Sequence, residues 1–202
     1  EGLFDESRKR ALPSTPTHIA VISSTQAAGY ADFMKIIGDR WGGLRIDVAH
    51  TLVQGADAPD QIIRAIQYFN TREELPEVLV IIRGGGSADD LSAFNDEQLV
   101  RAIAASRVPT LVGVGHEIDE SLSDLAADVS AATPSNAAQI VVPDKQEIIR
   151  SVQYRVSSLL PRLAQAIDGE KERVRTTLIR AFDSVVDRTR QTEDQLERLR
   201  RV

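Results

Sequence analysis

Short apolar runs alternate with stretches of helical periodicity through the first two thirds of the chain. Valine, isoleucine and leucine dominate four runs, at residues 18–23, 44–53, 77–83 and 109–114. Three of them are almost continuously apolar, which is typical of strands buried on both faces of a sheet. Between the runs, apolar residues recur at helical spacing in residues 30–40, 59–69 and 96–105. Repeated strand–helix units predict a three-layer α/β domain, with a parallel sheet and helices on both of its faces.

A different periodicity begins near Pro143. Apolar residues then repeat about every 3.5 positions from Ile148 to Leu163, and again from Val174 to Leu199. This pattern predicts a helical hairpin or a coiled coil. Pro161 is expected to kink or interrupt the helix, because proline lacks the N–H that an internal helical position donates.

These two patterns predict two parts of the chain. We expect an α/β catalytic domain with a polar N-terminal arm at residues 1–142, and a coiled-coil-like C-terminal helical segment at residues 143–202. The chain begins without methionine, and no glycine or proline stop signal closes its last helical pattern. We therefore expect a fragment of a longer polypeptide, with a truncated helix at its end.

Composition restricts the class of protein. The 202 residues include no cysteine, which excludes disulfides and thiolate zinc sites. A cytoplasmic protein fits this lack of cysteine, and no apolar run approaches the ~20 residues that a membrane span needs. Residues 1–150 carry 13 Lys and Arg against 22 Asp and Glu, a balance of −9, whereas residues 151–202 carry 11 against 8, a balance of +3. Charge alone leaves the arginine-rich segment open, as a phosphate-binding helix or a solvated surface.

A glycine-rich loop follows the third predicted strand. It reads Arg83, Gly84, Gly85, Gly86, Ser87. Three glycines allow backbone N–H groups to approach an anion closely, and the arginine fork can grip a phosphate. In a parallel α/β sheet, ligands bind at the carboxyl ends of the strands, where this loop lies. The alternative is a flexible tight turn with a surface arginine.

A histidine and an aspartate follow the fourth predicted strand. His116 lies in a glycine-containing loop, and Asp119 comes three residues later. The histidine could act as a general acid or base with the aspartate orienting its ring. His18 begins a strand at the opposite edge of the sheet, and His50 lies within a strand pattern, so we expect both to be structural.

Further candidates lie near the same edge. Asp32 falls one turn into the first helix, and the stretch from Thr133 to Ala138 predicts a helix start capped by Thr133 or Ser135. The sequence has no H-E-x-x-H pair and no clear cluster of metal-binding carboxylates. Metal dependence stays open, because Asp32, Asp119 and the Asp89-Asp90 pair could supply carboxylates.

Together these blocks resemble the large subunit of exodeoxyribonuclease VII. The resemblance covers residues 2–140 in family order and includes the following stretches: 2–5, 53–56, 83–87, 89–91, 94–97, 114–119, 124–128 and 133–138. One block departs from it. The family usually has a Ser-Pro-Thr-Gly-Ala-Ala turn before its aspartate, whereas residues 24–29 here read Ser-Thr-Gln-Ala-Ala-Gly, with no proline and a displaced glycine.

The resemblance implies hydrolysis of single-stranded DNA from either end into short oligonucleotides, in the bacterial cytoplasm. It also implies a small-subunit partner along the C-terminal helices and no requirement for added metal. By this interpretation, Arg83 and the Gly84, Gly85, Gly86 and Ser87 loop hold the scissile phosphate. His116 would be the general acid or base, oriented by Asp119, and Asp32 would position water.

Two other interpretations remain. The chain could be another α/β phosphate-ester hydrolase that acts on a small phosphorylated substrate. It could also be a non-catalytic assembly module, in which the helical segment is the working part and the α/β domain a scaffold.

Overall fold

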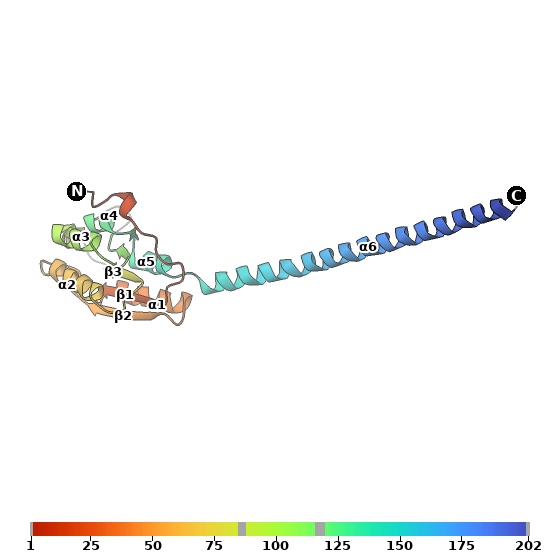
Figure 1. The fold of residues 1–202 in the computed structure, drawn as a ribbon. Coiled ribbons are helices and arrows are strands. Elements are labelled where there is room, and N and C mark those ends of the chain that lie inside the picture. Colours follow the sequence, from red (N-terminus) through yellow and green to blue (C-terminus); the bar gives the residue numbers. More distant parts are fainter. Residues whose placement is uncertain (1, 85–87, 116–119, 201–202) are drawn as a thin grey trace. The chain divides into compact units, whose positions relative to one another are not determined.

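The computed structural model describes residues 2–84, 88–115 and 120–200 of the chain. The chain divides into two compact units, residues 1–148 and 149–202. The first unit contains a five-stranded sheet, and the long helix α6 (Lys145–Arg200) makes up the described part of the second (Figure 1).

All the strand pairs of the sheet are parallel. Its strands are β1 (His18–Ser23), β2 (Arg45–His50), β3 (Val78–Ile82), β4 (Thr110–Gly113) and β5 (Val129–Ser130), in the spatial order β2-β1-β3-β4-β5. The four predicted strands are present, and the two-residue β5 at the edge was not predicted. Because such a short strand leaves no periodic pattern in the sequence, it could only be found through its pairing with β4.

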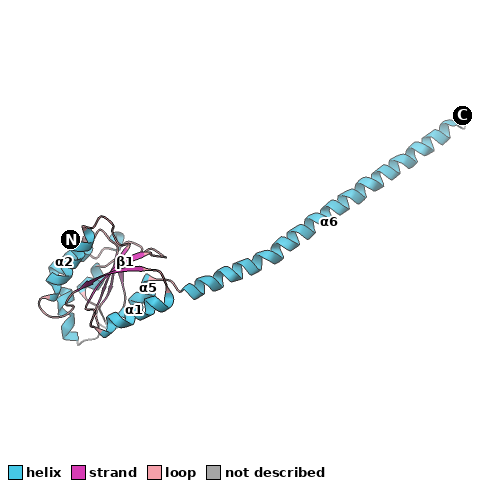
Figure 2. Ribbon diagram, turned by 90° about the horizontal axis from the view of Figure 1, so that it is seen from below, coloured by secondary structure: helices cyan, strands magenta, loops and turns pink. Residues whose placement is uncertain are grey.

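Helices cover both faces of the sheet (Figure 2). They are α1 (Ala28–Arg40), α2 (Ala58–Asn70), α3 (Glu97–Ala104), α4 (Leu122–Ala126) and α5 (Pro134–Val141), with short 3-10 helices η1 (Glu6–Arg8) and η2 (Ala88–Asn95). Side chains alternate along β1 between two cores. Ile19 and Val21 pack on one face with Phe33 of α1, whereas Ala20 and Ile22 pack on the other with residues of α2. The predicted three-layer α/β architecture is confirmed.

The edge strand β2 is shorter than the apolar run that predicted it. The run extends to Val53, but the strand ends at His50 and the chain then turns away. There the backbone N–H of Leu52 donates to the side-chain oxygen of Gln61 on α2, at 2.9 Å. Gly55 has a φ of +85°, a left-handed conformation that glycine adopts without strain, and it leads the chain into α2.

Helix α6 continues through Pro161 and Gly169. The expected interruption at Pro161 is wrong for the described residues, and so is the hairpin alternative. A proline removes one internal hydrogen bond, and the residues around it, mostly Leu, Arg, Ala and Gln, are strong helix formers that sustain the helix on both sides. Most described apolar side chains of α6 are exposed, Leu160 at 66% and Phe182 at 69%. In the part of the chain that the structure describes, no helix is both long and apolar enough to cross a membrane.

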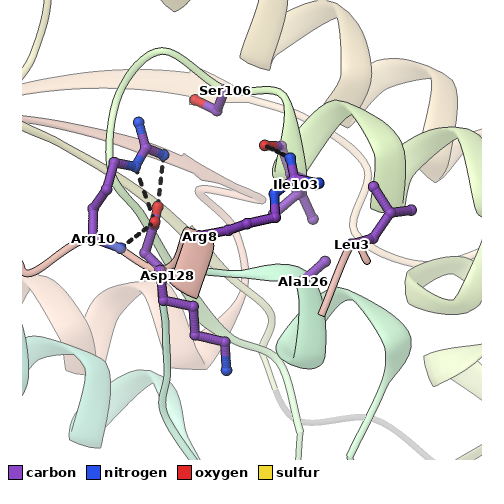
Figure 3. Close-up of a pocket in the computed structure, with 9 residues that line it drawn as sticks. Leu3, Arg8, Arg10, Ile103, Ser106, Ala126 and Asp128 are labelled. Atoms are coloured by element: carbon purple, nitrogen blue, oxygen red, sulfur yellow. Dashed lines mark hydrogen bonds and ion pairs between the residues drawn. The ribbon is translucent and has the colours of Figure 1, made fainter. Parts of the chain in front are cut away.

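The N-terminal arm is clamped to the α/β unit by a partly buried ion pair. The Asp128 side chain, 6% exposed, accepts from the backbone N, Nε and Nη2 of Arg10 at 2.7–2.9 Å (Figure 3). Asp128 also accepts from the backbone N–H and hydroxyl of Thr110, the first residue of β4. Burial would raise the pKa of the Asp128 carboxyl, but the hydrogen bonds from Arg10 and Thr110 and the Arg10 charge lower it on balance.

The same arm lines a small cavity of about 150 Å³ with Arg8, Lys9 and Arg10 (Figure 3). Each of these cations has a partner within the protein. Arg8 donates to the Ala104 carbonyl, Lys9 pairs with Glu6, and Arg10 pairs with Asp128. Because their hydrogen-bonding groups are used to fasten the arm, we assign this basic cluster a structural role.

Substitution Asp128→Asn is expected to lower the free energy of unfolding by about 2 kcal/mol at pH 7, since it removes a charge-assisted pair. The pKa of Asp128 is lower in the folded protein, so its contribution is complete above the unfolded pKa and is lost as pH falls through the folded pKa. Urea denaturation at pH 7 and in acid should therefore show a difference that shrinks in acid.

The control is Glu6→Gln, which removes a carboxylate that is 84% exposed. A surface pair of this kind should change stability by less than about 0.5 kcal/mol. An Asp128→Asn effect no larger than that of the control, or one independent of pH, would contradict the clamp.

Candidate functional site at the carboxyl edge of the sheet

The order of the strands defines where a ligand should bind. The chain passes from β1 outward to β2 and then returns to β3 on the other side of β1. In open parallel sheets, the crevice at such a switch point, beyond the carboxyl ends of the strands, is the usual binding site. Here the switch point lies between β1, which ends at Ser23, and β3, which leads into Arg83 and Gly84.

Two glycines allow the loop after β3 to pack very closely against the start of α1. A Cβ atom added at Gly29, in the first turn of α1, would lie 2.8 Å from the Gly84 Cα and 3.0 Å from the Arg83 carbonyl oxygen. A Cβ atom added at Gly84 would lie 2.6 Å from the Cβ of Ala27. Any larger side chain at either position would push the loop after β3 away from the start of α1.

The start of α5 joins the same contact. The Cβ position of Gly29 lies 2.9 Å from Cγ of Pro134, and that of Gly113, the last residue of β4, lies 3.3 Å from the Thr133 carbonyl oxygen. The Thr133 hydroxyl caps α5 by accepting from the Asn136 N–H at 3.1 Å, which decides between the two caps that the sequence allowed. The ends of β1, β3 and β4 are thus gathered with the amino ends of α1 and α5.

Arg83 is buried at this edge, with 3% of its surface exposed. The alternative in which Arg83 lies on the surface is therefore wrong, and the turn itself, at residues 85–87, lies outside the described residues. A buried guanidinium is held in one direction by its surroundings, which suits it to gripping a phosphate at a fixed place.

The amino end of α1 adds anion-binding capacity beside Arg83. Ala27 precedes the helix and has no side-chain group that could cap it. The first backbone N–H groups of a helix have no partner within the helix and carry partial positive charge. In α3, by contrast, Asp96 accepts from the N–H groups of Gln98 and Leu99. The uncapped end lies at the sheet edge where a phosphate would bind.

Two buried hydroxyl groups mark the same edge. The side-chain oxygens of Ser23, at the end of β1, and Thr51, directly after β2, have no hydrogen-bond partner among the described residues. An unpaired buried polar group costs about 1–3 kcal/mol, and in native proteins its position is explained by strain, by a functional role or by a bound water or ion. Both residues lie next to segments that line an open pocket.

That pocket lies between the loops that follow β1 and β2. It has a volume of about 280 Å³, and Gly84 forms part of its wall. The other lining residues are Ser24, Gln26, Ala27, Leu52, Val53 and Gln54. Sequence reasoning missed this pocket, since its two walls come from loops whose proximity depends on the pairing of β1 with β2.

The segments that follow the two glycine-containing loops are tied to each other. The side-chain oxygen of Asn95, at the end of η2, accepts from the Leu122 N–H at 2.8 Å, and the Ser123 hydroxyl donates to the Phe94 carbonyl at 2.7 Å. Ser121 and Asp124 form a capping box at the start of α4. Burial raises the pKa of the Asp124 carboxyl, and hydrogen bonds from Ser121 oppose the rise. These bonds fix where the chain emerges after residue 119.

The predicted site residues have different outcomes. The structure brings Arg83 and Gly84 together with the start of α1. Asp32 lies on α1, one turn after Gly29, where its side chain is exposed and makes no hydrogen bond or ion pair with another described residue. The remaining candidates lie outside the described residues, so their roles stay predictions: Gly85, Gly86, Ser87, His116 and Asp119.

The other two histidines are in structural positions. His18 lies at the amino edge of the sheet, with its Nε2 3.0 Å from the Asp47 carboxylate. The same carboxylate also accepts a hydrogen bond from the Arg72 guanidinium. Burial would raise the pKa of Asp47, but the His18 hydrogen bond and the charges of Arg45 and Arg72 lower it on balance. His50 ends β2, and its Nδ1 accepts from the Thr25 N–H at 3.1 Å, so it holds the turn after β1.

Among the side chains that the structure describes, which lie in residues 2–84, 91–115 and 120–193, no group of three His, Cys, Asp or Glu residues could hold a metal ion. The candidate carboxylates Asp89, Asp90 and Asp119 are outside this range. Whether the site uses a metal is therefore a question for experiment.

The fold is that of a doubly wound α/β protein, with buried Arg83 and the uncapped start of α1 at its switch point. Comparison with known proteins identifies the family to which the chain belongs. The family model described as "Exonuclease VII, large subunit" matches residues 3–202. The chain belongs to the exonuclease VII large-subunit family.

Individual relatives agree with this assignment. The chain is 40% identical to the exodeoxyribonuclease 7 large subunit of Rhodopirellula baltica over 98% of its own length and 46% of the relative. It is 46% identical to that of a Cyanothece species over 79% of the chain and 38% of the relative, and 44% identical to that of Syntrophotalea carbinolica over 87% and 45%. The chain thus spans less than half the length of these relatives.

Substitution Gly29→Ala is expected to destabilise the protein by about 1–3 kcal/mol, because a methyl group there must displace the backbone of Gly84. The matched control is Gly38→Ala on the same helix, where an added Cβ meets nothing within 4 Å. That variant should gain up to ~1 kcal/mol from helix propensity. Urea denaturation measures both, and equal effects would contradict the close contact.

Proposed function

We propose that this chain is the catalytic part of an exodeoxyribonuclease that hydrolyses the phosphodiester bonds of single-stranded DNA from its ends to short oligonucleotides. The observation that carries the proposal is the arrangement at the carboxyl edge, where buried Arg83, Gly84 and the uncapped amino end of α1 meet. The proposal is supported by membership of a family whose relatives are named exodeoxyribonuclease 7 large subunits. By the same resemblance, the enzyme works in the bacterial cytoplasm.

The mechanism assigns phosphate binding to the β3 end. Arg83 and the backbone amides of Gly84, Gly85 and Gly86 stabilise the negative charge that develops on the scissile phosphate, and Ser87 supports this loop. Such groups are effective because they are fixed before the reaction, and the burial of Arg83 and the tight packing of Gly84 against Gly29 provide that rigidity.

Proton transfer is assigned to the β4 end. His116 acts as the general acid or base, and Asp119 orients its ring. Asp32 positions the attacking water, for which its exposed location one turn into α1 leaves solvent access. None of these steps requires a divalent metal, so we propose that hydrolysis proceeds without one.

Substitution His116→Ala is expected to lower the rate of single-stranded DNA hydrolysis by about 10²- to 10⁴-fold, the usual contribution of a positioned acid–base group. The full-length protein with its small subunit should be assayed on end-labelled DNA in EDTA, beside wild type. A melting temperature close to that of wild type shows that the variant is folded.

The outcomes of this assay distinguish the role of His116, the use of a metal and the alternative functions. Near-normal hydrolysis by the variant would refute the role of His116. Wild-type activity that is absent in EDTA and restored by Mg²⁺ would replace the metal-free mechanism with one in which carboxylates hold the metal. If wild type cleaves small phosphate esters and ignores DNA, the small-substrate hydrolase is correct; if it cleaves neither, the assembly module is favoured.

We further propose that the small subunit binds along α6. Supporting this, α6 carries exposed apolar side chains at coiled-coil spacing in the segment where the family resemblance places that partner. Exposed apolar stripes of this length are typical of helix–helix interfaces.

Substitution Leu163→Glu places a charge in this stripe and is expected to abolish co-purification of the small subunit. The matched control, Gln165→Glu, adds a negative charge two residues away at an exposed polar position and should leave binding intact. Co-purification and light scattering measure the complex. Loss of binding in both variants, or in neither, would refute the proposed interface.

A further inference from the structure

The described residues around the open pocket beside Gly84 form a neutral lining. Its polar side chains are those of Ser24, Gln26 and Gln54, and Leu52 and Val53 contribute apolar surface. None of the described residues that line the pocket has a charged side chain, whereas phosphate sites characteristically use arginine and lysine. A lining of amides, a hydroxyl and apolar surface suits a neutral, flat ligand with a hydrogen-bonding edge.

The pocket shares a wall with the proposed phosphate site. Gly84 directly follows the buried Arg83, and it also packs against Ala27, which lines the same pocket. A group bound in the pocket would therefore lie next to a phosphate held by Arg83. With a volume of about 280 Å³, the pocket lies at the small end of the range for ligand sites, which fits a single base rather than a stretch of strand.

Side chains outside the pocket hold its two walls in place. His50 accepts from the Thr25 N–H through Nδ1 and faces the Thr25 hydroxyl at 3.0 Å, which fixes the turn after β1. Gln61 accepts from the Leu52 N–H, which fixes the loop after β2. The side-chain amide of Gln54, in contrast, makes no hydrogen bond with another described residue and is exposed at the rim.

We propose that this pocket receives one unstacked nucleobase of the DNA strand, adjacent to the phosphate that is hydrolysed. The inference rests on the proposed nuclease function and deepens it. Gln54 hydrogen-bonds the edge of the base, and His50 is a positioning residue that acts through Thr25. Because a glutamine amide both donates and accepts, it can serve any base, so the pocket selects an unpaired strand without selecting a sequence.

The test uses end-labelled oligonucleotides that carry a single abasic residue at successive positions, with the full-length enzyme. One abasic position should raise KM by about ten-fold for wild type, the usual scale of a single base contact, with kcat within about two-fold. Gln54→Ala should raise KM similarly on intact DNA and should lose most of its sensitivity to that abasic position, since both changes remove one interaction. Gln67→Ala, at an exposed position on α2, is the control and should behave as wild type.

The outcomes separate this inference from the proposed function. If wild type does not hydrolyse DNA, the nuclease proposal fails. If wild type hydrolyses DNA but no abasic position matters, or Gln54→Ala and the abasic residue act independently, the nuclease stands and the base pocket is refuted.

His50 provides a second test that a purely structural role would not satisfy. His50→Ala should raise KM by about ten-fold, because the Thr25 N–H loses its acceptor and the wall of the pocket moves. His50→Asn should restore KM to within about two-fold, since its side-chain oxygen can accept from the same N–H. Failure of His50→Asn to recover KM, or a loss confined to kcat, would refute the positioning role.

Discussion

The contact between Gly29 and Gly84 is the constraint on which the site depends. It joins the start of α1 to the end of β3 at a separation that leaves no space for a single Cβ atom. Pro134 lies against the same point, so three segments far apart in the sequence meet there. The uncapped helix end and the buried Arg83 lie beside each other as a result. This contact explains why a glycine stands at position 29, since any side chain there would collide with the backbone of Gly84.

The two edges of the sheet use their polar groups in different ways. At the amino edge, the charged side chains form ion pairs within the protein. Arg10 pairs with Asp128, and His18 and Arg72 pair with Asp47. At the carboxyl edge, the hydroxyls of Ser23 and Thr51 have no partner among the described residues. The charged groups at the amino edge are thus paired with one another, and these two hydroxyls at the carboxyl edge keep hydrogen-bonding capacity for a ligand.

Much of the fold was predictable, because it rests on local patterns. The continuous apolar runs identify buried parallel strands, and the spacing of Ile62, Ile66 and Phe69 identifies the buried face of α2. The path of the chain at Pro161 was not predictable from its local penalty, since the helix formers on both sides outweigh it. Strand β5 was missed because two residues carry no periodicity.

The site was predictable in part. Arg83 and Gly84 could be assigned because they follow a recognisable strand, and sequence places such residues at the carboxyl edge. The burial of Arg83, the roles of His50 and Gln61, and the pocket near Gln54 depend on strand register and on loops that meet only in three dimensions. A pattern along one chain cannot supply these relations.

The central claim is that DNA binds at the carboxyl edge, next to Arg83. The most direct measurement is a structure of the full-length His116→Ala protein with a short single-stranded oligonucleotide. The account predicts a backbone phosphate within hydrogen-bond distance of the Arg83 guanidinium or of the amides of Gly84, Gly85 and Gly86. A strand bound instead against the arm, at Arg8 and Lys9, would contradict it.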